Sequence, residues 1–167
     1  MEHANAAQHP AITRVEDFLK THQHPNMPIM LDDSARTAQE AADCLACEIS
    51  QIAKSIIFHN LVDNSAILII ISGDKRVDEK KVSALLDISK SKLGKASAEF
   101  VRDKTGFTIG GVSPIAHTSH CTIFLDNSLQ RFDTIWAAAG HPKAVFQASP
   151  TALKIMTQAT WVSVASE

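Results

Sequence analysis

Two apolar runs near the middle of the chain predict the centre of a β-sheet. Residues 52–58 and 66–72 are apolar over nearly their whole length, which is typical of strands that are covered on both faces. Residues 62–65 lie between them, and their Asp, Asn and Ser favour a turn. We therefore expect two adjacent strands at the centre of the sheet.

Capping signals and helical spacing predict short helices around these strands. Two capping boxes, at residues 13–16 and 37–40, indicate helices that end near Lys20 and near Cys47. Ser149-Pro150 fits the start of the last helix, because proline is favoured at the first helical position. Other helices are expected over residues 77–86 and 97–104.

The remaining apolar segments are short and predict further strands. The pair 134–138 and 144–147 fits a hairpin around Gly140. Single strands are expected over residues 29–31, 121–126 and 161–164. Because strands and helices interleave without a regular βαβ alternation, we predict an α+β fold around a mixed, curled sheet. A chain of 167 residues is most simply one domain, which we place at residues 1–167.

Composition places the chain among ordinary globular proteins and sets its expected compartment. Its apolar fraction is 45% and its charged fraction 20%. The longest apolar run, residues 66–71, is far shorter than the roughly 20 residues that span a bilayer. The first ten residues lack the basic and apolar regions of a signal peptide. An odd number of cysteines, three, fits a reducing compartment, so we expect a cytoplasmic protein without membrane contacts.

Charge is spread unevenly along the chain. The net charge of -2 argues against a protein that coats nucleic acid non-specifically. Residues 75–104 nevertheless hold nine basic side chains: Lys75, Arg76, Lys80, Lys81, Lys90, Lys92, Lys95, Arg102 and Lys104. Such a surface is suited to phosphates, although a solvated helix face of mixed charge explains the pattern equally well.

Lys54 is the most unusual residue in the predicted central strands. Alternation places it on the same face as Ile52 and Ile56, where an unpaired ammonium group would lose its hydration. Two interpretations remain open. Lys54 either lies at a cleft that receives an anionic partner, or it occupies an edge position from which its long side chain reaches solvent.

A glycine-rich segment follows, at residues 105–117, with the sequence TGFTIGGVSPIAH. Glycine is costly to order, so three glycines within seven residues indicate either a tight turn or a backbone that approaches a ligand closely. His141, beside Gly140 at the predicted hairpin turn, is placed where its side chain can project into a pocket. Phe132 and Trp136 are candidate pocket walls, for which core packing is the simpler explanation.

A metal site is a weaker possibility. His117, His120 and Cys121 lie close together, but on a strand His120 would point away from the other two and no acidic ligand is interleaved. Cys44 and Cys47 have no second ligand pair at zinc spacing, and we interpret them as packing residues of a helix. We therefore predict neither a metal nor another cofactor.

Taken in order, several of these segments resemble the YbaK family, the free-standing relatives of the editing domain in bacterial prolyl-tRNA synthetases. The similarity covers about residues 13–165. Its distinctive parts are the Lys54-Ser55 strand and the glycine-proline segment, and it also includes these strings: Thr37-Ala38-Gln39-Glu40, Ser72-Gly73-Asp74 and Trp136-Ala137-Ala138-Ala139-Gly140-His141-Pro142.

The resemblance implies a barrel-like mixed sheet and hydrolysis of mischarged aminoacyl-tRNA without a metal. It implies a tRNA(Pro)-type substrate with a small amino acid, bound through the tRNA 3′ end, with an aminoacyl-tRNA synthetase as a further partner. Catalytic roles map to Lys54, Gly110 and Gly111. Substrate-binding roles map to Ser55, Ile109, Val112, Ser113, Pro114, Gly140 and His141.

Two positions depart from the specialised branches of the family. The cysteinyl-specific branch has an aspartate near the position of Val145, and alanyl-specific members often have asparagine at the position of Ser55. Two other functions remain open: a non-catalytic module that binds an aminoacyl-tRNA end, a nucleotide or a protein, and a metal-dependent hydrolase that uses His117, His120 and Cys121. Both a monomer and a homodimer are compatible with the sequence.

Overall fold

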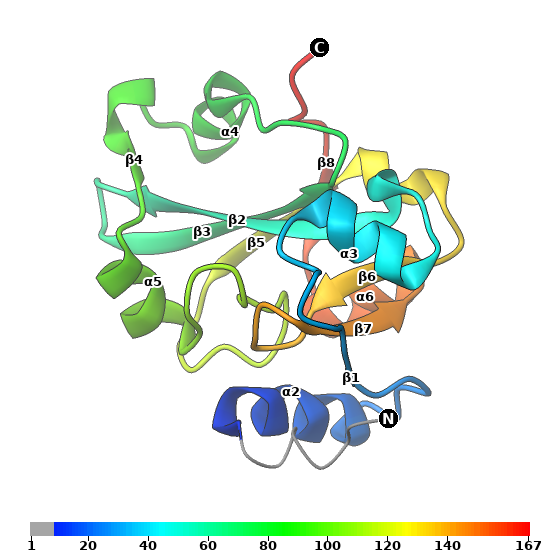
Figure 1. Ribbon diagram of the computed structural model, residues 1–167. Helices are drawn as coiled ribbons and strands as arrows, with labels where there is room; N and C mark the ends of the chain where they lie inside the picture. The colour runs from blue at the N-terminus through cyan, green and yellow to red at the C-terminus, as the bar shows by residue number, and fades with distance from the viewer. Residues whose placement is uncertain (1–8) are drawn as a thin grey trace.

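The computed structural model describes residues 9–167 and is built on one mixed sheet (Figure 1). Its strands are β1 (Ile29–Met30), β2 (Ile52–Asn60), β3 (Ser65–Ser72), β4 (Leu93–Lys95), β5 (Thr122–Asp126), β6 (Ile135–Ala138), β7 (Ala144–Ala148) and β8 (Thr160–Val162). The strand order is β1-β7-β6-β2-β3-β5-β8, and β4 pairs with β2 outside this path. The α+β fold with a mixed sheet is confirmed, and the sheet is open, with β1 and β8 at its ends.

The strands that were predicted to be central are central. β2 and β3 form an antiparallel pair over their full length, from Ala53 opposite Ser72 to Asn60 opposite Ser65. β6 and β7 form the expected antiparallel hairpin, whereas β5 and β8 add to β3 in parallel. The three-residue strand β4 was not predicted, because so short a segment carries no measurable alternation.

Five α-helices surround the sheet within the described residues: α2 (Pro10–Thr21), α3 (Ala38–Leu45), α4 (Glu79–Leu86), α5 (Ala98–Thr105) and α6 (Pro150–Thr157). The capping box at Thr37 and the serine cap at Ser149 are confirmed. The predicted start at Thr13 is wrong. Helix α2 begins at Pro10, whose fixed φ suits the first helical position, and the Thr13 amide donates to the carbonyl of His9. No described helix is long and apolar enough to cross a membrane.

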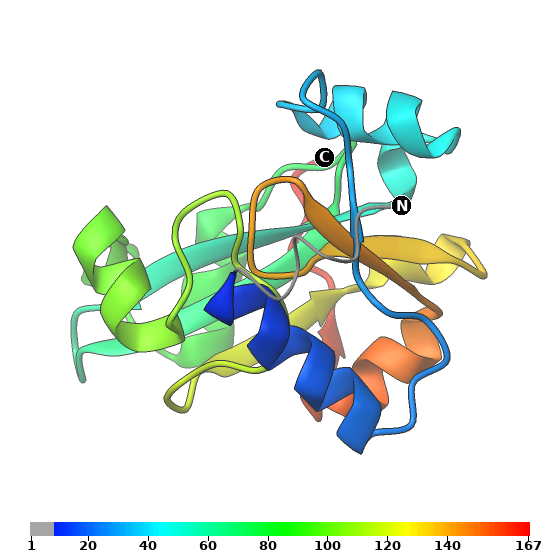
Figure 2. The same ribbon diagram turned by 60° about the horizontal axis from the view of Figure 1, so that its bottom comes forward.

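Both faces of the sheet are packed. Along β3, Leu68 and Ile70 belong to one core cluster and Ile67, Ile69 and Ile71 to the other, as alternation requires. Helices α2 and α6 cover the first cluster and α4 covers the second (Figures 1 and 2). Each fully buried Leu or Ile contributes about 1.5–3 kcal/mol relative to an exposed one. This double coverage explains why the run is continuously apolar.

Helix α2 also holds two loops in place. Arg14 donates hydrogen bonds to the carbonyls of Gly106 and Ala116, each at 3.0 Å, and so joins the two ends of the glycine-rich segment. Gly140, in the hairpin loop, packs so closely on Ala11 that a Cβ there would lie 2.8 Å from the Ala11 carbonyl group. Both loops therefore rest on the same helix.

Candidate functional site

A cavity of about 290 Å³ opens beside β2, at a point where the sheet is interrupted. On the side of β2 away from β3, β6 pairs with Ile52 and Ala53, and β4 pairs only from Phe58 onward. Residues 54–57 therefore have no strand partner on that side within the described chain. We call this gap the β2 notch, and it gives a central strand the exposed backbone of an edge.

Four of the predicted site residues line this cavity: Lys54, Ser55, Gly110 and Val112. Trp136, for which core packing was the simpler explanation, and Val145 also line it, together with Pro142 from the hairpin loop. Sequence analysis missed Arg36, which lines the cavity from the segment before α3. Its only sequence signal is its place beside the capping box, and that signal concerns helix formation rather than binding.

Lys54 lies at the β2 notch, where a strand from the middle of the sheet has a local edge that also borders the cavity, so its position combines the two interpretations. Its ammonium group donates a hydrogen bond to the carbonyl of Lys75 at 2.6 Å. Burial lowers the pKa of Lys54, the nearby Asp74 carboxylate raises it, and Arg76 lowers it further. One of its three donors is thus used for anchoring, and two remain for a ligand.

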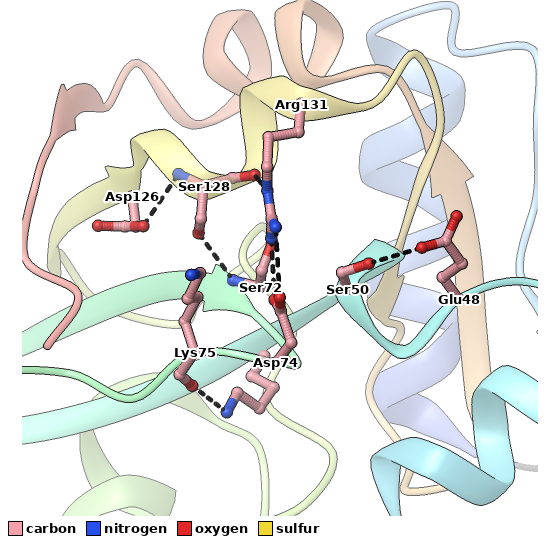
Figure 3. A network of polar contacts seen from close by, with 9 residues as sticks. Glu48, Ser50, Ser72, Asp74, Lys75, Asp126, Ser128 and Arg131 are labelled. Atoms are coloured by element: carbon pink, nitrogen blue, oxygen red, sulfur yellow. Dashed lines mark hydrogen bonds and ion pairs between the residues drawn. The ribbon is translucent and has the colours of Figure 1, made fainter. Parts of the chain in front are cut away.

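A polar network holds the loop that anchors Lys54 (Figure 3). Arg131 donates to both carboxylate oxygens of Asp74, at 3.2 and 2.8 Å, and its Nε donates to the carbonyl of Ser128 at 2.7 Å. The Ser72 amide donates to the hydroxyl of Ser128 at 3.3 Å. The bond from Arg131 lowers the pKa of Asp74, which keeps this carboxylate charged near the Lys54 ammonium. The network thus fixes the loop that carries the Lys75 carbonyl.

Ser55 lines the cavity and carries an unpaired polar atom. Its hydroxyl is buried and has no hydrogen-bond partner among the described residues. A buried hydroxyl without a partner costs about 1–3 kcal/mol, so a ligand that bonds to it would recover part of that cost.

The two adjacent glycines of the segment have different roles. Gly110 faces the cavity with φ = 91°, a conformation that disfavours side chains. Gly111 is buried, and its amide donates to the carbonyl of Thr108 at 3.0 Å. A Cβ on Gly111 would lie 2.9–3.0 Å from backbone atoms of His141. Gly111 thus lets the glycine-rich loop contact the hairpin loop, while the amides of Gly110 and Val112 have no acceptor among the described residues.

The other predicted site residues lie around the cavity rather than on its wall. Ile109 is 59% exposed, whereas Ser113 is fully buried. Pro114 lines a different hollow, and Gly140 packs on α2. These positions shape the loops that border the cavity.

His141 is oriented by its own loop. Its Nδ1 accepts a hydrogen bond from the Lys143 amide at 3.1 Å, and its ring lies 4.9 Å from that of His9. Burial, followed by the charges of His9 and Lys143, lowers the pKa of His141. The neighbouring Pro142, rather than His141, lines the cavity.

Two of the three residues considered for a metal site, His117 and Cys121, have other partners. The Nε2 of His117 is 2.7 Å from the carbonyl of Ser113, and the thiol of Cys121 donates to the carbonyl of Lys104. No group of three or more His, Cys, Asp or Glu side chains within residues 9–167 is arranged to hold a metal. Cys44 is exposed on α3, so its interpretation as a packing residue is wrong. It lies at the solvent face of a helix that buries only Ala42.

Comparison with known proteins places this geometry in a family. A model of the aminoacyl-tRNA editing domain matches residues 32–155. The "Uncharacterized protein YwhH" of Bacillus subtilis (strain 168) is 31% identical over 137 residues, which cover 81% of this chain and 85% of that protein. A proline–tRNA ligase of Lactobacillus acidophilus is 27% identical over 111 residues, 66% of this chain but only 19% of the ligase.

Solved structures agree with the sequence matches. A crystal structure described as that of a proposed trans-editing enzyme for prolyl-tRNA synthetase superimposes with a TM-score of 0.87 and 35% identity. The superposition covers 95% of this chain and 98% of the other. Helix α2, which lies outside the residues matched by the family model, is therefore within the span of chain that the two structures share.

Proposed function

Because this chain belongs to the aminoacyl-tRNA editing domain family, we propose that it hydrolyses the ester of mischarged aminoacyl-tRNA in trans. The observation that carries the proposal is Lys54, a partly buried cation that is tethered to the Lys75 carbonyl and lines a small cavity together with Gly110. The proposed substrate is a tRNA(Pro)-type aminoacyl-tRNA with a small amino acid. The matches to proline–tRNA ligases and to the trans-editing structure support that choice.

The size of the cavity supports a small amino acid. About 290 Å³ is at the lower end of the range for ligand pockets. Trp136, Val112 and Val145 are its bulky apolar walls, so larger side chains would be excluded by volume. Excluding larger amino acids by volume discriminates more strongly than favourable contacts do, because one methylene group changes the binding free energy by only about 1–3 kcal/mol.

The proposed mechanism relies on positioning and charge. An aminoacyl ester is already activated, so correct placement of a water molecule supplies much of the acceleration. The backbone amides of Gly110 and Val112 are the candidate donors to the oxyanion, and one such donor is worth about 3 kcal/mol in known cases. Lys54 stabilises negative charge on the ester or on the adjacent phosphate. A ribose hydroxyl of the substrate assists the attacking water, and no protein nucleophile is required.

The engaged amide of Gly111 gives that residue a different part in the mechanism. Its bond to Thr108 closes the turn that presents Gly110, and its contact with His141 joins the two loops beside the cavity. In this scheme Gly111 positions the oxyanion donors.

The proposed activity acts on a cytoplasmic substrate, and an aminoacyl-tRNA synthetase is the proposed partner that supplies it.

The test uses a panel of mischarged aminoacyl-tRNAs and measures ester loss under single turnover. Lys54→Ala should abolish deacylation without loss of the fold, whereas Lys154→Ala, an exposed lysine on α6, should keep the wild-type rate. An unchanged rate in Lys54→Ala would refute the assignment. Binding of aminoacyl-tRNA by the wild type without any ester loss would instead establish a non-catalytic binding module.

A further inference from the structure

A second hollow adjoins the candidate ester site through the β2 notch. We call it the basic groove; its volume is about 480 Å³, and its lining includes Lys54, Arg76 and Lys95 at the rim and Phe58, Ile71 and Val77 below them. Lys54 and Ile56 line both the basic groove and the cavity described above. The two hollows are therefore neighbours along β2 and share Lys54.

The charge of the basic groove is opposite to that of the whole chain. Three cationic side chains face one carboxylate, Glu79, although the net charge of the protein is -2. Neither Arg76 nor Lys95 forms an ion pair within residues 9–167, and both side chains are exposed. These two cations are thus available to an anionic ligand. The partly exposed Ile56 and Val77 give the groove an apolar floor.

Cations above an apolar floor complement a nucleotide, which has a charged phosphate and a flat base. Single-stranded nucleic acid is commonly bound by a positive groove that follows the backbone and by apolar surfaces that receive the bases. An aminoacyl ester held in the cavity is joined covalently to such a strand. That strand must leave the cavity, and the basic groove begins at Lys54 and Ile56, which also line the cavity.

We propose that the basic groove binds the single-stranded 3′ end of the tRNA, with the phosphates beside the terminal adenosine on Arg76 and Lys95. This inference rests on the proposed function and adds the path of the tRNA strand. The β2 notch separates two tasks: its Gly110 side receives the amino acid, and its Arg76 side receives the nucleotides. Lys54 lies at the junction of the two, next to the ester.

The test measures binding rather than hydrolysis, so it is independent of the deacylation assay. A fluorescent, unacylated tRNA acceptor minihelix with its single-stranded CCA end is titrated with protein at several salt concentrations, alongside the same hairpin without the overhang. The double variant Arg76→Ala/Lys95→Ala should bind the CCA minihelix about 10-fold more weakly, with each exposed contact worth about 3-fold. The slope of log affinity against log salt should fall by about 0.7 for each lost contact.

Two matched variants control for net charge and for folding. Lys20→Ala/Lys154→Ala removes the same charge from α2 and α6, which cover the opposite face of the sheet, and should bind within about twofold of the wild type. Arg76→Lys/Lys95→Arg keeps both charges and should retain binding of the CCA minihelix.

Three results would overturn the proposal. The wild type could bind the hairpins with and without the overhang equally tightly, or Arg76→Ala/Lys95→Ala could lose the same affinity for both hairpins. The third is that Lys20→Ala/Lys154→Ala loses as much affinity for the CCA minihelix as Arg76→Ala/Lys95→Ala does. If the wild type hydrolyses no ester but shows the expected dependence on the overhang, the proposed function fails and the basic groove remains a binding site for the strand.

Discussion

The contact between Gly111 and His141 makes the most specific prediction about the site. In Gly111→Ala, the new Cβ would lie 2.9 Å from the Cα and the N of His141, against 3.4 Å or more in ordinary contacts. Because these are backbone atoms, no side chain can rotate away, and one of the two loops must move by about 0.5 Å. Overpacking of this kind typically costs about 1–3 kcal/mol of unfolding free energy.

The same displacement acts on the amides that border the cavity. A 1 Å error in the position of catalytic groups costs about 100-fold, so a shift of half that size should lower the deacylation rate about 10-fold. Single-turnover ester loss at saturating enzyme reports the rate, and urea titration reports the unfolding free energy. Both are measured at a temperature where the variant is fully folded.

Gly94→Ala is the matched control, since it makes the same substitution on the far side of the β2 notch. The three atoms nearest to a Cβ on Gly94 all belong to the side chain of Leu61, at 3.2–3.4 Å, and Leu61 is 48% exposed and free to move. It should change the rate less than twofold and the stability by about 0.5 kcal/mol or less. Wild-type rate and stability in Gly111→Ala, or equal losses in both variants, would refute the proposed role of the loop contact.

Three other predictions follow from the site. Asp74→Asn should lower the pKa of Lys54, because the Asp74 carboxylate raises that pKa while burial and Arg76 lower it. The deacylation rate, which needs the charged Lys54, should then fall at a lower pH on the alkaline side. A pH–rate profile that does not shift would contradict this. Ser55→Ala should leave the unfolding free energy unchanged or raise it by about 1 kcal/mol, since the hydroxyl has no partner, and should alter the relative rates across the aminoacyl-tRNA panel. Excess chelator should not change deacylation, and a loss of rate that zinc restores would favour a metal-dependent hydrolase.

Local signals located most of the secondary structure. The capping box at Thr37, the Ser149-Pro150 start and the two apolar runs are signals between residues close in sequence, and each element formed where they indicated. The α2 boundary was misplaced because Thr13 and Glu16 fit a capping pattern that Pro10, earlier in the chain, overrides. Strand β4 was missed since three residues are stabilised by pairing with β2, which the sequence does not reveal.

The candidate site was predictable in part. Lys54 was conspicuous because an isolated cation in an apolar strand needs an explanation, and Gly110 because of its cluster of glycines. The assignment of binding roles to Ile109, Ser113, Pro114, Gly140 and His141 stays a prediction, and none of these residues lines the cavity. Arg36 carried no comparable signal, because an arginine beside a helix cap is ordinary and only the fold brings it to the cavity.

By itself, the sequence determined most of the strands and helices, the family to which the chain belongs, and the few residues, such as Lys54, whose polarity differs from that of their neighbours. Each of these depends on residue type and on near neighbours in the chain. Only the tertiary structure decided that β2 exchanges one partner strand for another at residues 54–57, which opens the notch beside Lys54. It also decided that Gly111 meets His141 and that the basic groove adjoins the cavity, because contacts across the sheet are set by packing and not by local preference.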